Sequence, residues 1–192
     1  MKGVGAELEC MGMFDRIVIA VDGSDEAKRA ARRGLALAAE FNATVDVLHV
    51  VPLQSLRLTQ TPDEQTRLRD RGEAALAEIE ALASEHGYPI TTTLAEGKPA
   101  AQISEHAAEL NADLIVIGRQ GMTGLGKRLL GGVTEQVLHR SDVPVFVVPE
   151  ANQVTEYARI LVPTDGSENA EVASPYGAAI AQSYGSAVHV LN

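Results

Sequence analysis

The chain has 192 residues, of which 45% are hydrophobic, and its 16 Lys and Arg against 26 Asp and Glu give a formal net charge of −10. This length suits one domain, or one domain and part of another, and the apolar fraction is that of a folded globular protein. The acidic charge and the 4% of aromatic residues argue against nucleic acid as a partner, and the single cysteine, Cys10, excludes an internal disulfide and a multi-thiolate zinc site.

The first segment, residues 1–13, has neither helical nor strand periodicity, and we expect a disordered N-terminal tail there. It contains no apolar region of the kind found in signal peptides. No apolar run in the chain approaches the ~20 residues that cross a bilayer. The expected location is therefore cytoplasmic, with no membrane partner.

Apolar runs of strand length then alternate with longer segments of helical periodicity. The first strand is expected at 16–21 and ends in Asp22-Gly23-Ser24, where Ser24 is a suitable N-cap for a helix over 25–41. The further expected elements, in chain order, are a strand at 44–50, a helix at 63–86, a strand at 89–94, a helix at 99–110, a strand at 113–117, a short helix at 133–140 and a strand at 143–148.

This alternation of apolar strands with helices predicts an α/β fold with a parallel sheet covered by helices on both faces. Open sheets of this kind hold ligands beyond the carboxyl ends of the strands, where the strand order reverses. The loops after the first and fourth strands are therefore the candidate binding region.

The first strand and its turn recur late in the chain. Residues 15–26, DRIVIAVDGSDE, return as residues 158–169, ARILVPTDGSEN, at an offset of 143 residues that corresponds to a whole domain. We therefore expect one domain at 14–150, a linker at 151–156 and an incomplete second domain of β-α-β form at 157–192. The chain is then either a piece of a tandem protein or the product of a gene that ends early.

A glycine-rich segment, GRQGMTGLGKRLLGGVT, follows the fourth strand at residues 118–134. Glycines at a strand end and at a helix start let backbone N–H groups approach phosphate oxygens, but turns with positive φ also use glycine, and the residues alone leave both interpretations open. A P-loop does not fit, because Arg128 stands where its hydroxyl residue should be, and G-x-G-x-x-G does not fit, because Leu129 takes the place of the third glycine.

These features together resemble the universal stress protein family, with a full domain over 14–150 and the opening of a second over 157–192. The pattern G-x2-G-x9-G-[S/T] of its ATP-binding members matches at Gly118, Gly121 and Gly131, while Gly132 stands at the Ser/Thr position. The resemblance implies an open, Rossmann-like sheet of five parallel strands in the order 3-2-1-4-5. It also implies a homodimer formed through the edge strand at 143–148.

The resemblance further implies a site for ATP or another adenine nucleotide, with or without Mg²⁺, and no catalytic or metal-ligating residue. Asp22 matches the family's acidic residue beside the nucleoside. On propensity alone a turn or cap role is the commoner one for such a residue, and the family match favours the nucleoside role. The other implied site residues are Ala20, Val50, Ile117, Gly118, Gln120, Gly121, Gly131, Gly132, Val133 and Thr134. Gly132 lacks the hydroxyl that would bind a phosphate, and Thr134 supplies a hydroxyl two residues on.

The leading functional interpretation is a stress-response or regulatory protein that binds an adenine nucleotide and responds by changing its association. The alternative is a family member that has lost nucleotide binding and acts only through dimerisation or partner contacts. A slow ATPase ranks third, because the sequence offers no evident general base or magnesium ligand. Arg119, Lys127 and Arg128 flank the glycine segment, where they either neutralise phosphate charge or simply face solvent.

Overall fold

The structure is a computed structural model that describes residues 13–53, 62–120, 130–149 and 157–192. The chain divides into two compact units, of which one is 14–150 and the other includes 151–192. The linker predicted at 151–156 and the tail predicted at 1–13, Met13 apart, lie outside the described residues.

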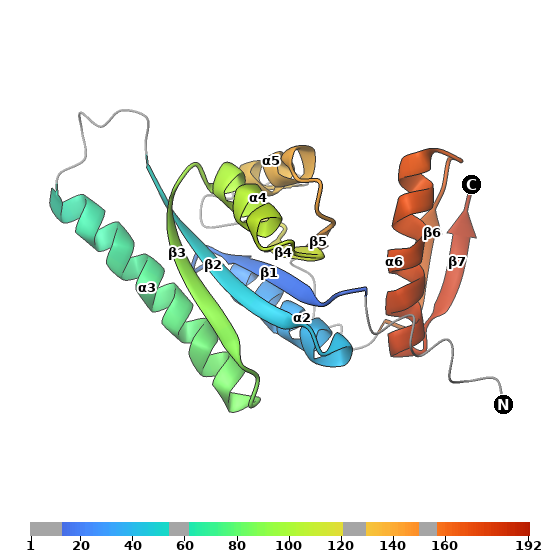
Figure 1. The fold of residues 1–192 in the computed structure, drawn as a ribbon, viewed down its shortest axis with the longest axis horizontal. Helices are drawn as coiled ribbons and strands as arrows, with labels where there is room; N and C mark the ends of the chain where they lie inside the picture. The colour runs from blue at the N-terminus through green and yellow to red at the C-terminus, as the bar shows by residue number, and fades with distance from the viewer. Residues whose placement is uncertain (1–12, 54–61, 121–129, 150–156) are drawn as a thin grey trace. The chain divides into compact units, whose positions relative to one another are not determined.

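The first unit is built on a parallel sheet in the order β3-β2-β1-β4-β5, which confirms the predicted fold and strand order (Figure 1). Its strands are β1 (Arg16–Val21), β2 (Thr44–Pro52), β3 (Ile90–Gly97), β4 (Leu114–Gly118) and β5 (Val145–Val148). The central strands β1 and β4 are nearly all apolar and buried, as expected for strands covered on both faces.

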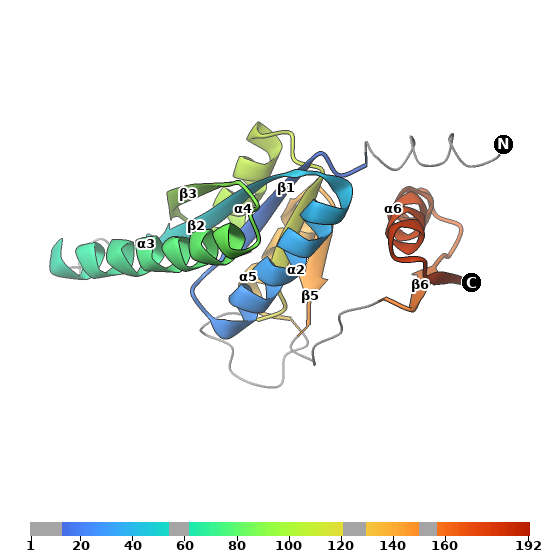
Figure 2. The same cartoon turned by 90° about the horizontal axis from the view of Figure 1, so that it is seen from below.

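Four helices cover this sheet in two layers. They are α2 (Asp25–Phe41), α3 (Pro62–Glu85), α4 (Pro99–Glu109) and α5 (Gly132–Arg140). The helices α2 and α3 lie on one face of the sheet, and α4 and α5 lie on the other (Figure 1, Figure 2). Alternate residues of each strand therefore enter two different cores: Ile19 lies against Gly34 of α2, whereas Val18 belongs to the cluster beneath α4 and α5.

The helix ends follow local sequence signals. Ser24 caps α2 as predicted, since its hydroxyl oxygen accepts a hydrogen bond from the Ala27 N–H at 3.1 Å. Asn42 ends the same helix in the left-handed conformation. Pro99 opens α4 at the first helical position, where its missing N–H costs nothing.

Two strands are longer than their apolar runs predict. The pairing of β2 with β3 continues to Pro52 beside Gly97, whereas the predicted strands end at residues 50 and 94. Backbone hydrogen bonds between the two strands hold this extension, and such bonds do not require apolar side chains. The extension carries the carboxyl ends of β2 and β3 to Pro52 and Gly97.

The second unit repeats the opening of the first. It consists of β6 (Arg159–Pro163), α6 (Glu168–Tyr184) and β7 (Ala187–Leu191), with the two strands parallel. Arg159 pairs with Ala187 as Arg16 pairs with Thr44, which is the same register at the sequence offset of 143 residues. The repeated sequence therefore builds the same local β-α-β form.

Equivalent apolar positions differ greatly in exposure between the two units. Val18 and Val47 are 0% exposed, whereas their equivalents Leu161 and Val190 are 60% and 69% exposed. In the first unit, neighbouring strands and helices cover these positions.

Among the described helices, none has the length and apolar character needed to cross a bilayer.

Candidate functional site

The reversal of strand order places the candidate site at the centre of the sheet. β1 and β4 are neighbours, but the chain leaves β1 toward β2 and leaves β4 toward β5. Their pairing brings Ala20 next to Ile117 near the carboxyl ends of both strands. A site between these strand ends is where ligands of open α/β sheets bind.

Three of the predicted site residues belong to the apolar core near this end. Ala20, Val50 and Ile117 are buried and belong to one core cluster on the face covered by α4 and α5. Val137 of α5 is part of the same cluster. This apolar cluster therefore lies on the face of the sheet from which α5 begins.

Hydrogen bonds join the loop after β4 to the start of α5. The Thr134 Oγ1 donates to the Gly118 carbonyl at 2.9 Å, and the Gly131 N–H donates to the Arg119 carbonyl at 2.8 Å. Thr134 is only 3% exposed, so its hydroxyl links the two glycine segments to one another. Gly121 lies outside the described residues.

The N-terminus of α5 differs from that of α2. Its N-cap is Gly131, which provides no side-chain hydrogen bond. The next two residues, Gly132 and Val133, are both exposed to solvent. The first N–H groups of a helix have no partner within the helix, and they favour an anion together with the helix dipole. The start of α5 can therefore bind a phosphate or another anion through its backbone.

Neither the backbone conformation nor crowding by described atoms requires a glycine at position 132. Its φ is not in the left-handed region. A Cβ added there would meet no described atom within 4 Å. A serine can therefore take this position without clashing with the described part of the chain.

Asp22 has a local structural role in the turn after β1. Its Oδ1 accepts a hydrogen bond from the Ser24 N–H at 3.0 Å. Asp165 does the same for Ser167 at 2.9 Å, and its hydrogen bonds with Ser167 lower the pKa of Asp165. The hydrogen bond from Ser24 thus supports a role for Asp22 in the turn. A contact between Asp22 and a ligand would be an additional role.

His49 lies behind Asp22 on the face covered by α3. Its ring packs against Gly72, where an added Cβ would lie 2.7 Å from the His49 Cδ2. Burial lowers the pKa of His49, while the negative charge of Asp22 and a hydrogen bond with the Val21 backbone oppose this shift. Burial thus favours the neutral form of the His49 ring, which packs as a core residue.

A contact made by Glu26 is not evident from the sequence. This residue lies in the first turn of α2, and its Oε2 accepts a hydrogen bond from the Gln120 N–H at 2.8 Å. Acidic residues are common in first helical turns because of the helix dipole, so the residue type alone does not reveal the contact. The Glu26 carboxylate thus reaches the loop after β4.

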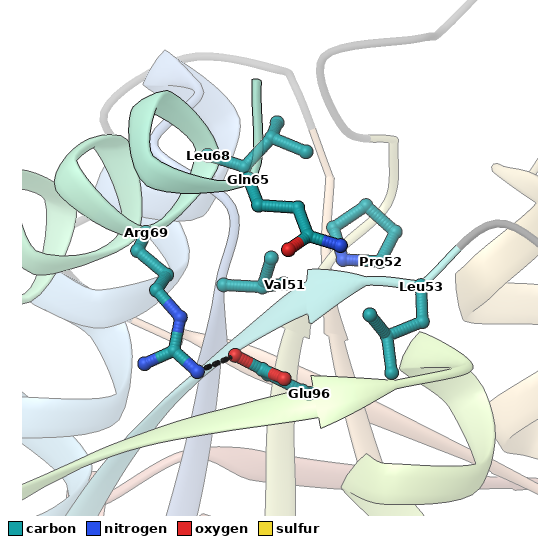
Figure 3. Close-up of a pocket in the computed structure, with 7 residues that line it drawn as sticks. All are labelled: Val51, Pro52, Leu53, Gln65, Leu68, Arg69 and Glu96. Carbon is teal, nitrogen blue, oxygen red and sulfur yellow. Dashed lines mark ion pairs between the residues drawn. The ribbon is translucent and has the colours of Figure 1, made fainter. Parts of the chain in front are cut away.

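A small pocket lies elsewhere, between the start of α3 and the ends of β2 and β3 (Figure 3). Its volume is about 50 Å³, far below the ~300 Å³ at which sites for small molecules begin. Arg69 and Glu96 form an ion pair at its wall, so the charge of the arginine is already balanced. Within the described ranges, no group of three or more His, Cys, Asp or Glu could hold a metal ion.

The fold and this end of the sheet define a doubly wound parallel α/β protein in which a helix without a side-chain cap begins at the switch point. The chain belongs to the universal stress protein family, whose family model matches residues 13–149. A universal stress protein of Methanocaldococcus jannaschii is 38% identical over 142 residues, which cover 71% of this chain and 82% of the relative. Universal stress protein YxiE of Bacillus subtilis is 33% identical over 147 residues, which cover 71% and 99%.

Solved structures agree with this membership. A universal stress protein in complex with cAMP is 31% identical, with a TM-score of 0.57, over 71% of this chain and 98% of that one. A universal stress protein from Archaeoglobus fulgidus DSM 4304 has a TM-score of 0.78 over 94% of this chain and 66% of its own, at 23% identity. The second match supports the fold alone.

Proposed function

We propose that the first unit binds an adenine nucleotide, ATP or a related one, at the carboxyl ends of β1 and β4. The observation that carries this proposal is the apolar cluster with Ala20, Val50 and Ile117 on the face from which α5 begins with no side-chain cap. Apolar side chains suit the adenine ring, and a helix N-terminus suits phosphate. The relative solved with cAMP, itself an adenine nucleotide, supports the same ligand class.

The proposed roles follow the match of these residues to the family's ATP-binding pattern. Asp22 recognises the nucleoside, and Gly118, Gln120 and Gly121 lie at the ribose and phosphates. The phosphates are held by the start of α5, at Gly131, Gly132, Val133 and Thr134. In this scheme Mg²⁺ enters, where it is used, with the nucleotide. The bound nucleotide then acts in stress response by changing the association of the protein.

Mass spectrometry of freshly purified, denatured protein tests this function. We expect a co-purified adenine nucleotide, and calorimetry should show one binding event per chain. Absence of nucleotide, together with no binding of added ATP, AMP or adenosine, would favour a family member that acts through association alone. Release of phosphate above the nucleotide-only background would instead indicate a slow ATPase.

Replacing Gly132 by serine is expected to tighten ATP binding by up to about tenfold, because one additional hydrogen bond to a phosphate contributes about 1.4 kcal/mol. The gain should be smaller for adenosine, which has no phosphate. Gly132→Ala is the matched control, since it adds the Cβ without the hydroxyl, and it should leave the ATP affinity nearly unchanged. Weaker ATP binding by the serine variant in calorimetry would refute the role of the hydroxyl.

We also propose that the chain forms a homodimer through β5. This strand is an outer strand of the sheet, and Val145, Phe146 and Val147 are partly exposed. Open strand edges with apolar side chains favour pairing with a second copy. Light scattering at micromolar concentrations should give the mass of two chains, and a monomer mass across a wide concentration range would contradict this.

We propose in addition that residues 157–192 are the opening of a second domain of the same family. The repeated register and the repeated Asp-Gly-Ser turn support this. The described part of this unit contains no counterpart of α5, so we assign the nucleotide to the first unit only.

A further inference from the structure

We infer that Glu26 determines which adenine ligand the site prefers, because its carboxylate places a negative charge on the loop that faces the phosphates. This inference rests on the proposed function. It predicts that the site disfavours ligands in proportion to their phosphate charge.

The contact between α2 and the loop after β4 is close. The Gln120 N–H donates to the Glu26 Oε2 at 2.8 Å. A Cβ added to Gly118 would lie 3.3 Å from the backbone C and O atoms of Glu26. The first turn of α2 therefore lies directly against the loop, and the Glu26 carboxylate is one of its acceptors.

The Gln120 donor differs from two neighbouring donors. The Arg119 N–H donates to the Val148 carbonyl and the Gly131 N–H donates to the Arg119 carbonyl, so both are bound to the backbone. Gln120 instead donates to a side chain that can rotate away, and this acceptor is an anion. A phosphate oxygen that binds this N–H would either displace the Glu26 carboxylate or lie beside its negative charge.

The acid is not needed to form the turn or the helix start. In the second unit the position equivalent to Glu26 is Asn169, at the offset of 143 residues. The helix α6 nevertheless begins with the same cap, in which the Ser167 hydroxyl accepts from the Ala170 N–H. The local fold therefore does not require a negative charge at position 26.

Like charges repel, so the effect of Glu26 grows with the charge of the ligand. Adenosine carries no phosphate, AMP carries one and ATP carries three. We expect Glu26→Gln, which keeps an acceptor oxygen but removes the charge, to tighten ATP binding about five- to tenfold. AMP should gain less, and adenosine should bind as it does to the wild type.

The matched control is Asp25→Asn, which removes the same charge one residue away. The Asp25 side chain is 87% exposed and lies 3.8 Å from Lys28, so solvent screens it. Its affinity for ATP should change less than about twofold. Glu26→Ala, which removes the acceptor as well, is the second variant and should also raise the ratio of ATP to adenosine affinity.

Calorimetry with adenosine, AMP and ATP distinguishes the possible failures. If the wild type binds adenosine or ATP, but neither Glu26 variant raises the ratio of ATP to adenosine affinity, the inference is wrong and the proposed function stands. An equal rise of this ratio in the Asp25→Asn protein would also overturn the inference, since removing any negative charge near the start of α2 would then have the same effect. If the wild type binds none of the three ligands, the proposed function fails as well.

Discussion

Replacing Asp22 by alanine is expected to weaken adenosine and ATP binding by the same factor, roughly 10- to 100-fold. Under the proposed function, the lost contact is with the nucleoside, which both ligands share. A hydrogen bond to a charged group contributes about 1.5 to 3 kcal/mol, and this range sets the size of the effect. Calorimetric titration of both ligands against the variant and the wild type measures the two factors.

Two controls separate the loss of a contact with the nucleoside from damage to the turn after β1. Asp165→Ala removes the equivalent hydrogen bond to a serine N–H in the second unit, where no nucleotide site is proposed, and it should leave both affinities unchanged. Asp22→Asn keeps an acceptor for the Ser24 N–H and should preserve the turn while it loses the charge. Wild-type adenosine affinity in the Asp22→Ala protein would show that Asp22 is only a turn residue.

Replacing His106 by alanine is expected to lower the free energy of unfolding of the first unit by roughly 3 kcal/mol. The His106 Nε2 lies 2.8 Å from the Oδ1 of Asp46, which is 7% exposed on β2. The other Asp46 oxygen accepts from the Thr93 hydroxyl at 3.3 Å. Without His106, a buried carboxylate keeps only this weaker partner, and leaving a buried charge uncompensated is costly.

Urea unfolding of the variants measures this loss. The double variant Asp46→Leu with His106→Leu should recover most of the stability, because both polar groups are then removed together. The control is His86→Ala, since His86 is exposed and its ring nitrogen lies 2.9 Å from the Leu82 carbonyl on its own helix. A midpoint of unfolding for His106→Ala equal to that of the His86 variant would contradict the expectation.

Much of the fold could be predicted from the sequence, because the signals are local. The bounds of β1 and α2 agree with the prediction, since an apolar run, a serine cap and helical periodicity are all contained in residues 16–41. The far ends of β2 and β3 could not be predicted in the same way. The extension includes the exposed Pro52 and Glu96, which are not typical of a buried strand, and pairing between the two strands keeps these residues extended.

The candidate site can be predicted from the sequence only in part. The glycines and Asp22 are proposed from motifs, which occupy short stretches of chain. Glu26 and the pairing of Asp46 with His106 cannot be predicted in this way, because their contacts join residues 94 and 60 positions apart. The Thr134 hydroxyl donates to the Gly118 carbonyl, a contact that depends on how the fold brings two segments together.

The bond from Thr134 to Gly118 has a consequence for the two described ends of the glycine motif. It holds the start of α5 against the end of β4 by direct contact between residues 16 positions apart. A ligand that contacts both ends therefore meets groups whose spacing is set before it binds, so less ordering entropy is lost on binding.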